Sequence, residues 1–209
     1  YTAALSLPEA QAFTLNRLKI DSLYLPYWLM NSEELESMFI ESNEANSHNQ
    51  VSQFKQAVIL NKEKHNPDIA EMMYDTPVYF SIKEVHRYIE NMNNEIIGRL
   101  DGENKPKLAD GTLIEARKDN YFDTLCTFVP PSTAKDSKAT NGPFNGEFNQ
   151  FVSRLETKLG DKRLRFLLHP SKADGTPFKT ADFEEIMKQF LGYLTKANIT
   201  VVDLSGIPF

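Results

Sequence analysis

The residue most clearly suited to chemistry in this sequence is a single acid at the end of a short apolar segment. Residues 199–202 read Ile-Thr-Val-Val, and Asp203 follows them directly. Such a run is typical of a buried strand. Ligands of parallel α/β sheets gather at the carboxyl ends of the strands, where Asp203 would hold a magnesium ion or its water shell beside a nucleotide. An acid in this position more often caps a loop or the following helix, and that alternative stays open.

An acid that ends an apolar strand is typical of the Walker B segment of phosphate-handling proteins. Ser205 and Gly206 follow Asp203 and would let the backbone turn close to a bound group, so Ser205 is a candidate cofactor-binding residue. The phosphate-binding sequence G-x-x-x-x-G-K-[ST] occurs nowhere in the 209 residues. The sequence therefore contains one half of a nucleotide site.

A basic cluster precedes this segment, and its guanidinium groups could face a phosphate or a neighbouring subunit. Arg163 is the first choice within the cluster, because it opens a predicted strand. The alternative is an ordinary solvated face. The cluster consists of Arg154, Lys158, Lys162, Arg163 and Arg165.

Composition restricts the classes of protein to which the chain can belong. Hydrophobic residues make up 41% of the chain and charged residues 25%, which is ordinary globular usage. The net charge of -6 gives no overall attraction for nucleic acid, so any contact with DNA has to be local. No apolar run approaches the roughly 20 residues of a membrane span, and no signal segment opens the chain. We therefore expect a cytoplasmic protein that does not insert into a membrane.

Capping residues and apolar spacing predict five helices. The clearest runs from a capping box at Ser81 and Glu84 to Gly98, with apolar residues at intervals of 0, 3, 4, 7 and 11. The predicted helices extend from Asn31 to Phe39, from Ser47 to Asn66, from Ser81 to Gly98, from Phe148 to Gly160 and from Thr180 to Gly192.

Extended segments are predicted between these helices, and their order indicates the fold class. They lie at residues 18–25, 78–80, 163–168 and 199–204. A strand, a helix and a strand within about 40 residues form a βαβ unit, which favours a parallel pair of strands. We therefore predict an α/β fold, with a partial parallel sheet and a βαβ unit at the C-terminal end and a helix-rich insertion before it.

Three regions follow from this pattern. Residues 1–100 form a strand and helical insertion region, and residues 147–209 form a partial α/β core that ends at the Asp203 strand. Residues 101–146 between them are an irregular loop, with a possible hairpin at Asp110 and Gly111. Within that loop, residues 130–146 are predicted to be flexible.

Several separated segments together resemble the HerA-type ATPases, which are hexameric DNA-translocating motors related to FtsK and also called bipolar DNA helicases. The first and the last of these segments are the most specific. They are residues 23–31 (LYLPYWLMN), 33–35 (EEL), 79–82 (YFSI), 161–166 (D-x-R-x-x-F), 189–192 (QFLG) and 202–208 (VDLSGIP).

The resemblance implies ATP hydrolysis that drives movement along duplex DNA, often beside a partner nuclease, by a homo-oligomeric ring, commonly a hexamer. It assigns Asp203 as the catalytic, magnesium-linked Walker B residue. Arg163 becomes a candidate for an arginine that acts in trans or as a sensor. ATP and magnesium are the implied cofactors of the parent protein.

The same resemblance implies that the chain is a central fragment of its parent. It would begin just after an Asp-Pro-His-Gly-Glu-Tyr-like motif and stop within the Walker B region, before the water-polarising acid. We therefore expect the isolated chain to hydrolyse no ATP and to bind it weakly. The alternative function is a non-catalytic protein-interaction module whose terminal strand only looks nucleotide-related.

Overall fold

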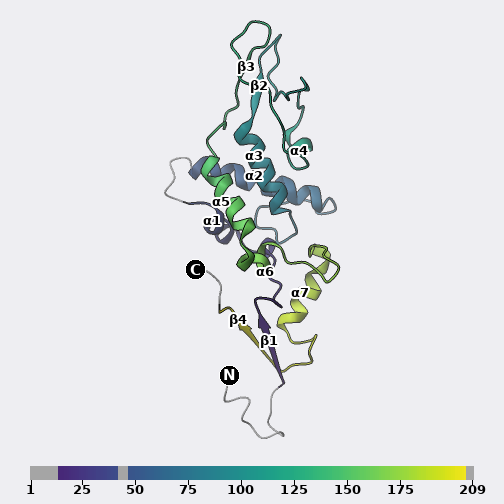
Figure 1. Ribbon diagram of the computed structural model, residues 1–209. Coiled ribbons are helices and arrows are strands. Elements are labelled where there is room, and N and C mark those ends of the chain that lie inside the picture. The colour runs from purple at the N-terminus through teal and green to yellow at the C-terminus, as the bar shows by residue number, and fades with distance from the viewer. Residues whose placement is uncertain (1–13, 42–46, 206–209) are drawn as a thin grey trace. The chain divides into compact units, whose positions relative to one another are not determined.

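Two units make up the chain, and the computed structural model describes residues 14–41 and 47–205 of it (Figure 1). One unit, here called the strand unit, combines residues 1–29 with residues 161–209. The other, here called the helical unit, comprises residues 30–160. The predicted boundaries at residues 100 and 146 rest on composition, which is a different criterion from contacts, and they stay a prediction.

Four helices of the helical unit lie in the segments where the sequence predicts helices. Helix α1 (Ser32–Phe39) begins with a complete capping box: the Glu34 N–H donates to Asn31 Oδ1 at 3.0 Å, and the Asn31 N–H donates to Glu34 Oε2 at 2.9 Å. Both exchanges satisfy donors that the first turn of a helix leaves unpaired. The other three are α2 (Ser47–His65), α3 (Ile82–Asn94) and α5 (Asn149–Gly160).

The prediction that α3 continues to Gly98 is wrong. The helix ends at Asn94, because Glu95 adopts an extended conformation with ψ 132°. Strand β2 (Ile96–Gly98) follows and pairs antiparallel with β3 (Ala139–Asn141), as Figure 1 shows at the end of α3. The segment predicted as a flexible loop therefore contains a paired strand.

Two shorter predictions for the helical unit have opposite outcomes. The turn at Asp110 and Gly111 is confirmed: Gly111 has φ 90°, and Leu108 N–H donates to the Thr112 carbonyl at 2.8 Å. Lys107 and Leu113 form an antiparallel bridge across this turn. The strand predicted at residues 78–80 is wrong, since that segment is irregular. A short helix, α4 (Arg117–Asn120), follows the turn.

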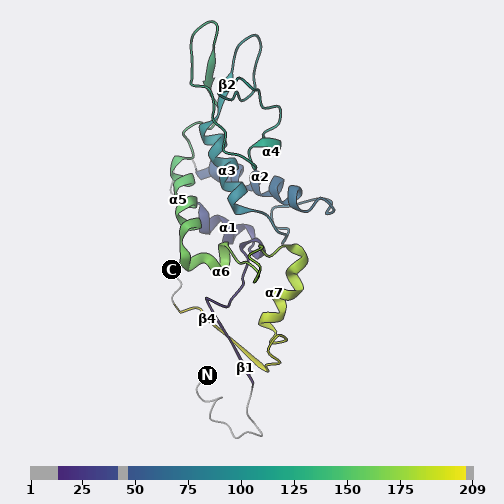
Figure 2. The ribbon, with the colours of Figure 1, turned by 45° about the vertical axis from the view of Figure 1, so that its right-hand side comes forward.

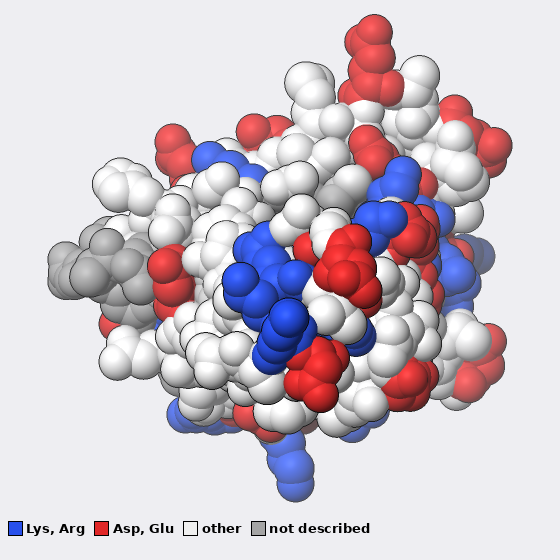
Figure 3. All heavy atoms as spheres, turned by 90° about the horizontal axis from the view of Figure 1, so that it is seen from above, with Lys and Arg blue, Asp and Glu red and all other residues white. Residues whose placement is uncertain are grey.

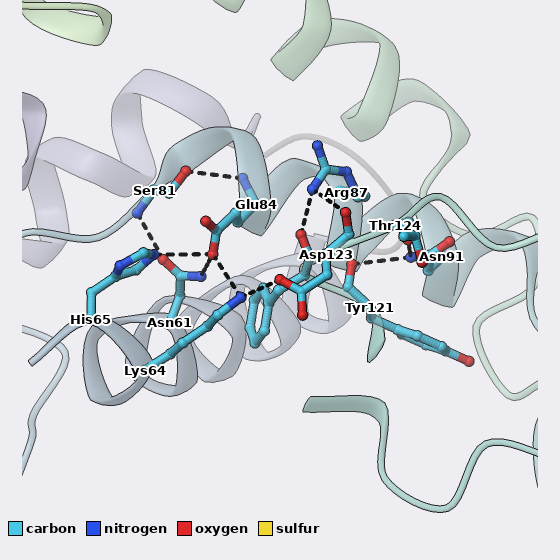
Figure 4. A network of polar contacts seen from close by, with 11 residues as sticks. Asn61, Lys64, His65, Ser81, Glu84, Arg87, Asn91, Tyr121, Asp123 and Thr124 are labelled. Atoms are coloured by element: carbon cyan, nitrogen blue, oxygen red, sulfur yellow. Dashed lines mark hydrogen bonds and ion pairs between the residues drawn. The ribbon is translucent and has the colours of Figure 1, made fainter. Parts of the chain in front are cut away.

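A polar network joins α2, α3 and the segment after α4 (Figure 4). Glu84 Oε2 accepts from Asn61 Nδ2 at 2.7 Å and lies 3.1 Å from His65 Nε2. Lys64 Nζ lies 3.4 Å from the same oxygen and 2.5 Å from Asp123 Oδ1. The capping box predicted at Ser81 is thus only half present: Ser81 Oγ accepts from the Glu84 N–H, while the Glu84 carboxylate binds α2.

This network makes the stability of the chain sensitive to acid. Burial would raise the pKa of Glu84, but hydrogen bonds from His65 and Asn61 outweigh it and lower that pKa to about 2. The stabilisation is therefore present above the usual value of 4.5 and is lost as the pH falls toward 2. After allowance for screening of a partly exposed group, it amounts to about 1–2 kcal/mol.

Glu84→Gln should therefore remove that part of the acid sensitivity, as measured by urea unfolding at several pH values. Glu90→Gln is the matched control in the same helix. The Glu90 carboxylate lies 3.9 Å from His86 Nδ1, which is longer than the contacts that Glu84 makes with Asn61 and His65. An unfolding free energy of Glu84→Gln that falls with acid as steeply as that of the unmodified chain would contradict the prediction.

The strand unit contains one parallel pair of strands among its described residues. Strand β1 (Leu15–Lys19) pairs with β4 (Ile199–Asp203), and the register places Leu15 opposite Ile199 and Lys19 opposite Asp203 (Figure 2). Helix α7 (Phe183–Phe190) is tied to β1, because Asn16 Nδ2 donates to the Gln189 carbonyl at 2.8 Å. The α/β class and the presence of parallel strands are confirmed, but the two paired strands are not those of the predicted βαβ unit.

The strand predicted at residues 163–168 is wrong. It was the first strand of the predicted βαβ unit, so that unit is wrong as well. Asp161 Oδ1 accepts from the Arg163 N–H at 2.9 Å and starts a 3₁₀ turn over Lys162–Leu164. Helix α6 (Arg165–Leu168) follows without a break. The partner of β4 therefore comes from the other end of the chain.

Among residues 14–41 and 47–205, no helix has both the length and the apolar content that crossing a lipid bilayer requires.

Candidate functional site

The alternation of side chains in β1 and β4 sorts the charged residues onto one face of the pair. Asn16 and Leu18 are buried, while Arg17 and Lys19 are exposed. Residues opposite each other in a parallel register share a face, so Arg17, Lys19 and Asp203 lie on the same one. Helix α7 bonds to the opposite face through Asn16. Among the described residues, Arg17 and Lys19 of the charged face are therefore exposed, and the face ends at the carboxyl ends of both strands.

Asp203 lies at that edge, as predicted, and it is held there by two neighbours. Arg17 Nη2 donates to its Oδ2 at 2.6 Å, and the Ser205 hydroxyl donates to its Oδ1 at 2.6 Å. These hydrogen bonds, first that of Ser205 and then that of Arg17, hold the pKa of the Asp203 carboxyl well below its usual range. The carboxylate is therefore ionised and fixed in orientation.

Arg163 lies on the 3₁₀ turn and not on a strand. Its Nε and Nη2 atoms donate to the two carboxylate oxygens of Asp161 at 3.0 and 2.8 Å. This hydrogen-bonded pairing raises the pKa of Arg163, whose side chain is 62% exposed. A paired arginine with an exposed side chain can exchange its partner for an incoming anion.

One pocket brings the three predicted site residues together, and we call it the strand-edge pocket. Its volume is about 540 Å³, within the usual range for small-molecule sites. Four basic residues and two acids supply its charge, so it favours an anionic ligand. The residues that line it are Arg17, Lys19, Ile20, Asp21, Lys162, Arg163, Asp203 and Ser205.

The basic cluster of the sequence is divided between the two units. Arg154 belongs to α5, where its Nε donates to the Phe39 carbonyl at 3.1 Å and its Nη1 lies 3.4 Å from Glu41. Lys158 lies one turn further along the same helix. Only Lys162, Arg163 and Arg165 belong to the strand unit.

Basic and acidic side chains are mixed on the face seen from the end that carries β2 and β3. Seen from that end, lysine and arginine side chains lie directly beside aspartate and glutamate side chains (Figure 3). Among the residues that follow β2 in the chain, Lys105 pairs with Glu115 and Lys107 with Glu103.

Arg17 and Lys19 are site residues that sequence reasoning missed. The available signal was the alternation of β1, since Leu-Asn-Arg-Leu-Lys places both cations on the side opposite Asn16 and Leu18. Their position beside Asp203 depends on a pairing between segments 184 residues apart.

A comparison with protein-family models finds no model that matches this chain, and a comparison with curated protein sequences finds no match either.

Proposed function

We propose that this chain is part of an ATP-driven DNA translocase of the HerA type, in which Asp203 is the magnesium-side carboxylate of the ATP site. The observation that carries the proposal is the position of Asp203. A parallel strand pair delivers it to the carboxyl edge, and Ser205 and Arg163 line the same pocket. Nucleotide sites of parallel α/β proteins lie at this edge.

The donors at this edge fit magnesium and a nucleotide phosphate. A carboxylate and a hydroxyl 2.6 Å apart offer oxygen ligands of the kind that magnesium prefers. Bound there, the ion would neutralise phosphate charge. Asp203 and Ser205 would hold it, while Arg17 and Lys19 would attract the phosphates. Arg163 would pair with negative charge on the nucleotide or on an adjoining subunit. The phosphate-binding loop and the water-polarising acid would come from other parts of the parent.

The proposed setting is a homo-oligomeric ring, of hexameric size, that moves along duplex DNA in the cytoplasm beside a partner nuclease. The sequence segments that resemble the HerA family support this setting, and residues 23–31 and 202–208 are the most specific of them. Since the chain has a net charge of -6, the positive surface that contacts DNA has to be local.

The proposal is tested with Asp203→Asn in the full-length protein that contains this chain. DNA-stimulated, magnesium-dependent ATP turnover should fall about 100-fold, because the amide lacks the charge that helps to hold the ion. Glu185→Gln is the control, since it changes an exposed acid of α7 that does not line the pocket. Turnover that Asp203→Asn leaves unchanged would remove the metal-side role.

A second candidate function is a non-catalytic protein-interaction module. Exposed apolar side chains around α7 favour it: Tyr193 is 69% exposed, Leu194 62% and Leu191 56%. Surfaces of this kind mark contacts between proteins when they are contiguous. This candidate predicts that no DNA-stimulated ATP turnover is found in the full-length protein.

A further inference from the structure

A second pocket of the strand unit is lined by basic residues of the turn that precedes and forms α6, and we call it the turn pocket. Helical spacing of three and four places Lys162, Arg165 and His169 on one side of this turn. The intervening residues Phe166, Leu167 and Leu168 are buried, and Phe166 contributes to the lining of the pocket. The pocket has a volume of about 360 Å³, and all three polar residues line it together with Lys172.

The positive charge of the turn pocket is not fully compensated. Lys172 Nζ lies 2.6 Å from Asp182 Oδ1. Within residues 14–41 and 47–205, by contrast, neither Lys162 nor Arg165 has an ion pair through its side chain. Asp21 is the one carboxylate among the residues that line the pocket. An anion that entered would therefore gain two or more attractive partners and one repulsive one.

The strand unit as a whole favours an anion more than the helical unit does. Its sequence contains nine basic and eight acidic residues, whereas the helical unit contains 14 basic and 21 acidic residues. Three of the nine basic residues, with His169, lie at the turn pocket. The positive charge is thus concentrated where a hollow exists to receive a ligand.

An aromatic wall adjoins these basic residues. Tyr24 is 37% exposed, and its ring packs on Phe178 with ring centroids 4.9 Å apart. Its backbone is fixed, because the Tyr24 N–H donates to Gln189 Oε1 at 2.9 Å. The next residue, Leu25, donates its N–H to the Phe166 carbonyl at 3.2 Å and so joins the wall to α6. An ordered ring beside cations is a surface on which nucleotide bases stack.

We propose that the turn pocket binds a phosphate group of a nucleotide unit, with Arg165 and Lys162 as the anion-binding residues and Tyr24 as the stacking surface. The site is separate from the magnesium-side carboxylate, although the two pockets share Ile20, Asp21 and Lys162. A planar guanidinium pairs with two phosphate oxygens at once, so Arg165 is expected to contribute most. The same phosphate chemistry is offered by a free nucleotide and by a nucleic-acid backbone.

The test is a titration of the 209-residue chain at low salt with three probes: inorganic phosphate, ATP without magnesium, and a 12-nucleotide oligothymidylate. Amide chemical shifts locate the binding, which is expected at residues 162–172. Arg165→Ala should weaken phosphate binding about tenfold, and Lys162→Ala should weaken it less. Lys188→Ala removes one charge from the same unit outside both pockets and should leave the affinity unchanged.

The relative affinities of the three probes distinguish a free nucleotide from a nucleic-acid backbone as the source of the phosphate, and the variants test the proposal itself. Tighter binding of the oligonucleotide than of ATP would assign the pocket to a nucleic-acid backbone, and the reverse order would assign it to a free nucleotide. Tyr24→Ala should weaken both of these probes but not inorganic phosphate. Equal losses for Arg165→Ala and Lys188→Ala, or shifts confined to other residues, would overturn the proposal. Asp203→Asn should retain phosphate binding at the turn, whatever its effect on ATP turnover.

Discussion

Replacing Glu95 with alanine is expected to lower the free energy of unfolding of the helical unit by about 3–4 kcal/mol. The Glu95 side chain is only 2% exposed at the end of α3. Arg117 donates to its two oxygens from Nε and Nη2 at 2.6 and 2.8 Å, and the Tyr121 hydroxyl donates at 2.7 Å. Alanine would remove the acceptor of all three hydrogen bonds.

The position of Glu95 explains why the loss should be large. Its carboxylate joins the end of α3 to Arg117 of α4, whereas its backbone carbonyl, which alanine would keep, accepts from the Gly142 N–H at 2.9 Å. A Cβ atom on residue 142 would lie 2.8 Å from Glu95 Oε1, so the carboxylate fills the space beside the glycine. Burial, followed by the hydrogen bond to Glu95, raises the pKa of Tyr121, which keeps the hydroxyl a donor.

Urea unfolding followed by far-ultraviolet circular dichroism measures the effect, since the helical unit contains most of the described helical residues. Glu156→Ala is the matched control, because it removes an exposed carboxylate from α5. A loss below about 1 kcal/mol for Glu95→Ala would show that the three donors find other partners.

Helix positions could be predicted in the helical unit because their signals are local. Asn31 and Glu34 exchange hydrogen bonds within one turn, and the apolar spacing of α3 and α5 reports which side of each helix is buried. The end of α3 could not be predicted in this way. Ile96 continues the spacing of the helix, but it is buried in β2 instead, because β3 supplies hydrogen-bond partners from more than 40 residues away.

Residues 163–168 were misread because a short apolar run cannot by itself distinguish a strand from a buried helix. The local evidence for a helix was Asp161, whose carboxylate caps the turn that starts at Lys162. The error also changes the chemistry. On a strand, Arg163 and Arg165 would share a face, whereas on the helical turn Arg165 joins Lys162 and His169.

The part of the candidate site that lies on a single strand could be predicted from the sequence. The run that ends at Asp203 correctly indicates a strand and places the acid at its carboxyl end. Arg17 could not be foreseen beside Asp203, because nothing near either residue specifies that β1 pairs with β4. β4 itself is only partly buried, so the local sequence of either segment carries no signal for a pairing over this distance.

Phe54→Ala is expected to lower the free energy of unfolding of the helical unit by about 3–5 kcal/mol. Phe54 lies on α2 and is fully buried. Its ring centroid lies 5.8 Å from that of Phe39 on α1, 5.8 Å from that of Phe151 on α5 and 6.5 Å from that of Tyr74. The three ring pairs are tilted or edge-on, which are favourable arrangements for aromatic side chains.

Loss of the Phe54 ring would open a cavity that its neighbours cannot fill together, since they come from two other helices and from the segment between α2 and α3. Phe54→Leu keeps most of the volume and should cost less than half as much as Phe54→Ala. Met73→Ala is the control for truncation of an apolar side chain, because Met73 is 66% exposed. Urea unfolding should therefore give the order Met73→Ala, Phe54→Leu, Phe54→Ala from the smallest loss to the largest. Equal losses for the two Phe54 variants would contradict the prediction, because they would mean that aliphatic volume at position 54 restores none of the stability that the ring provides.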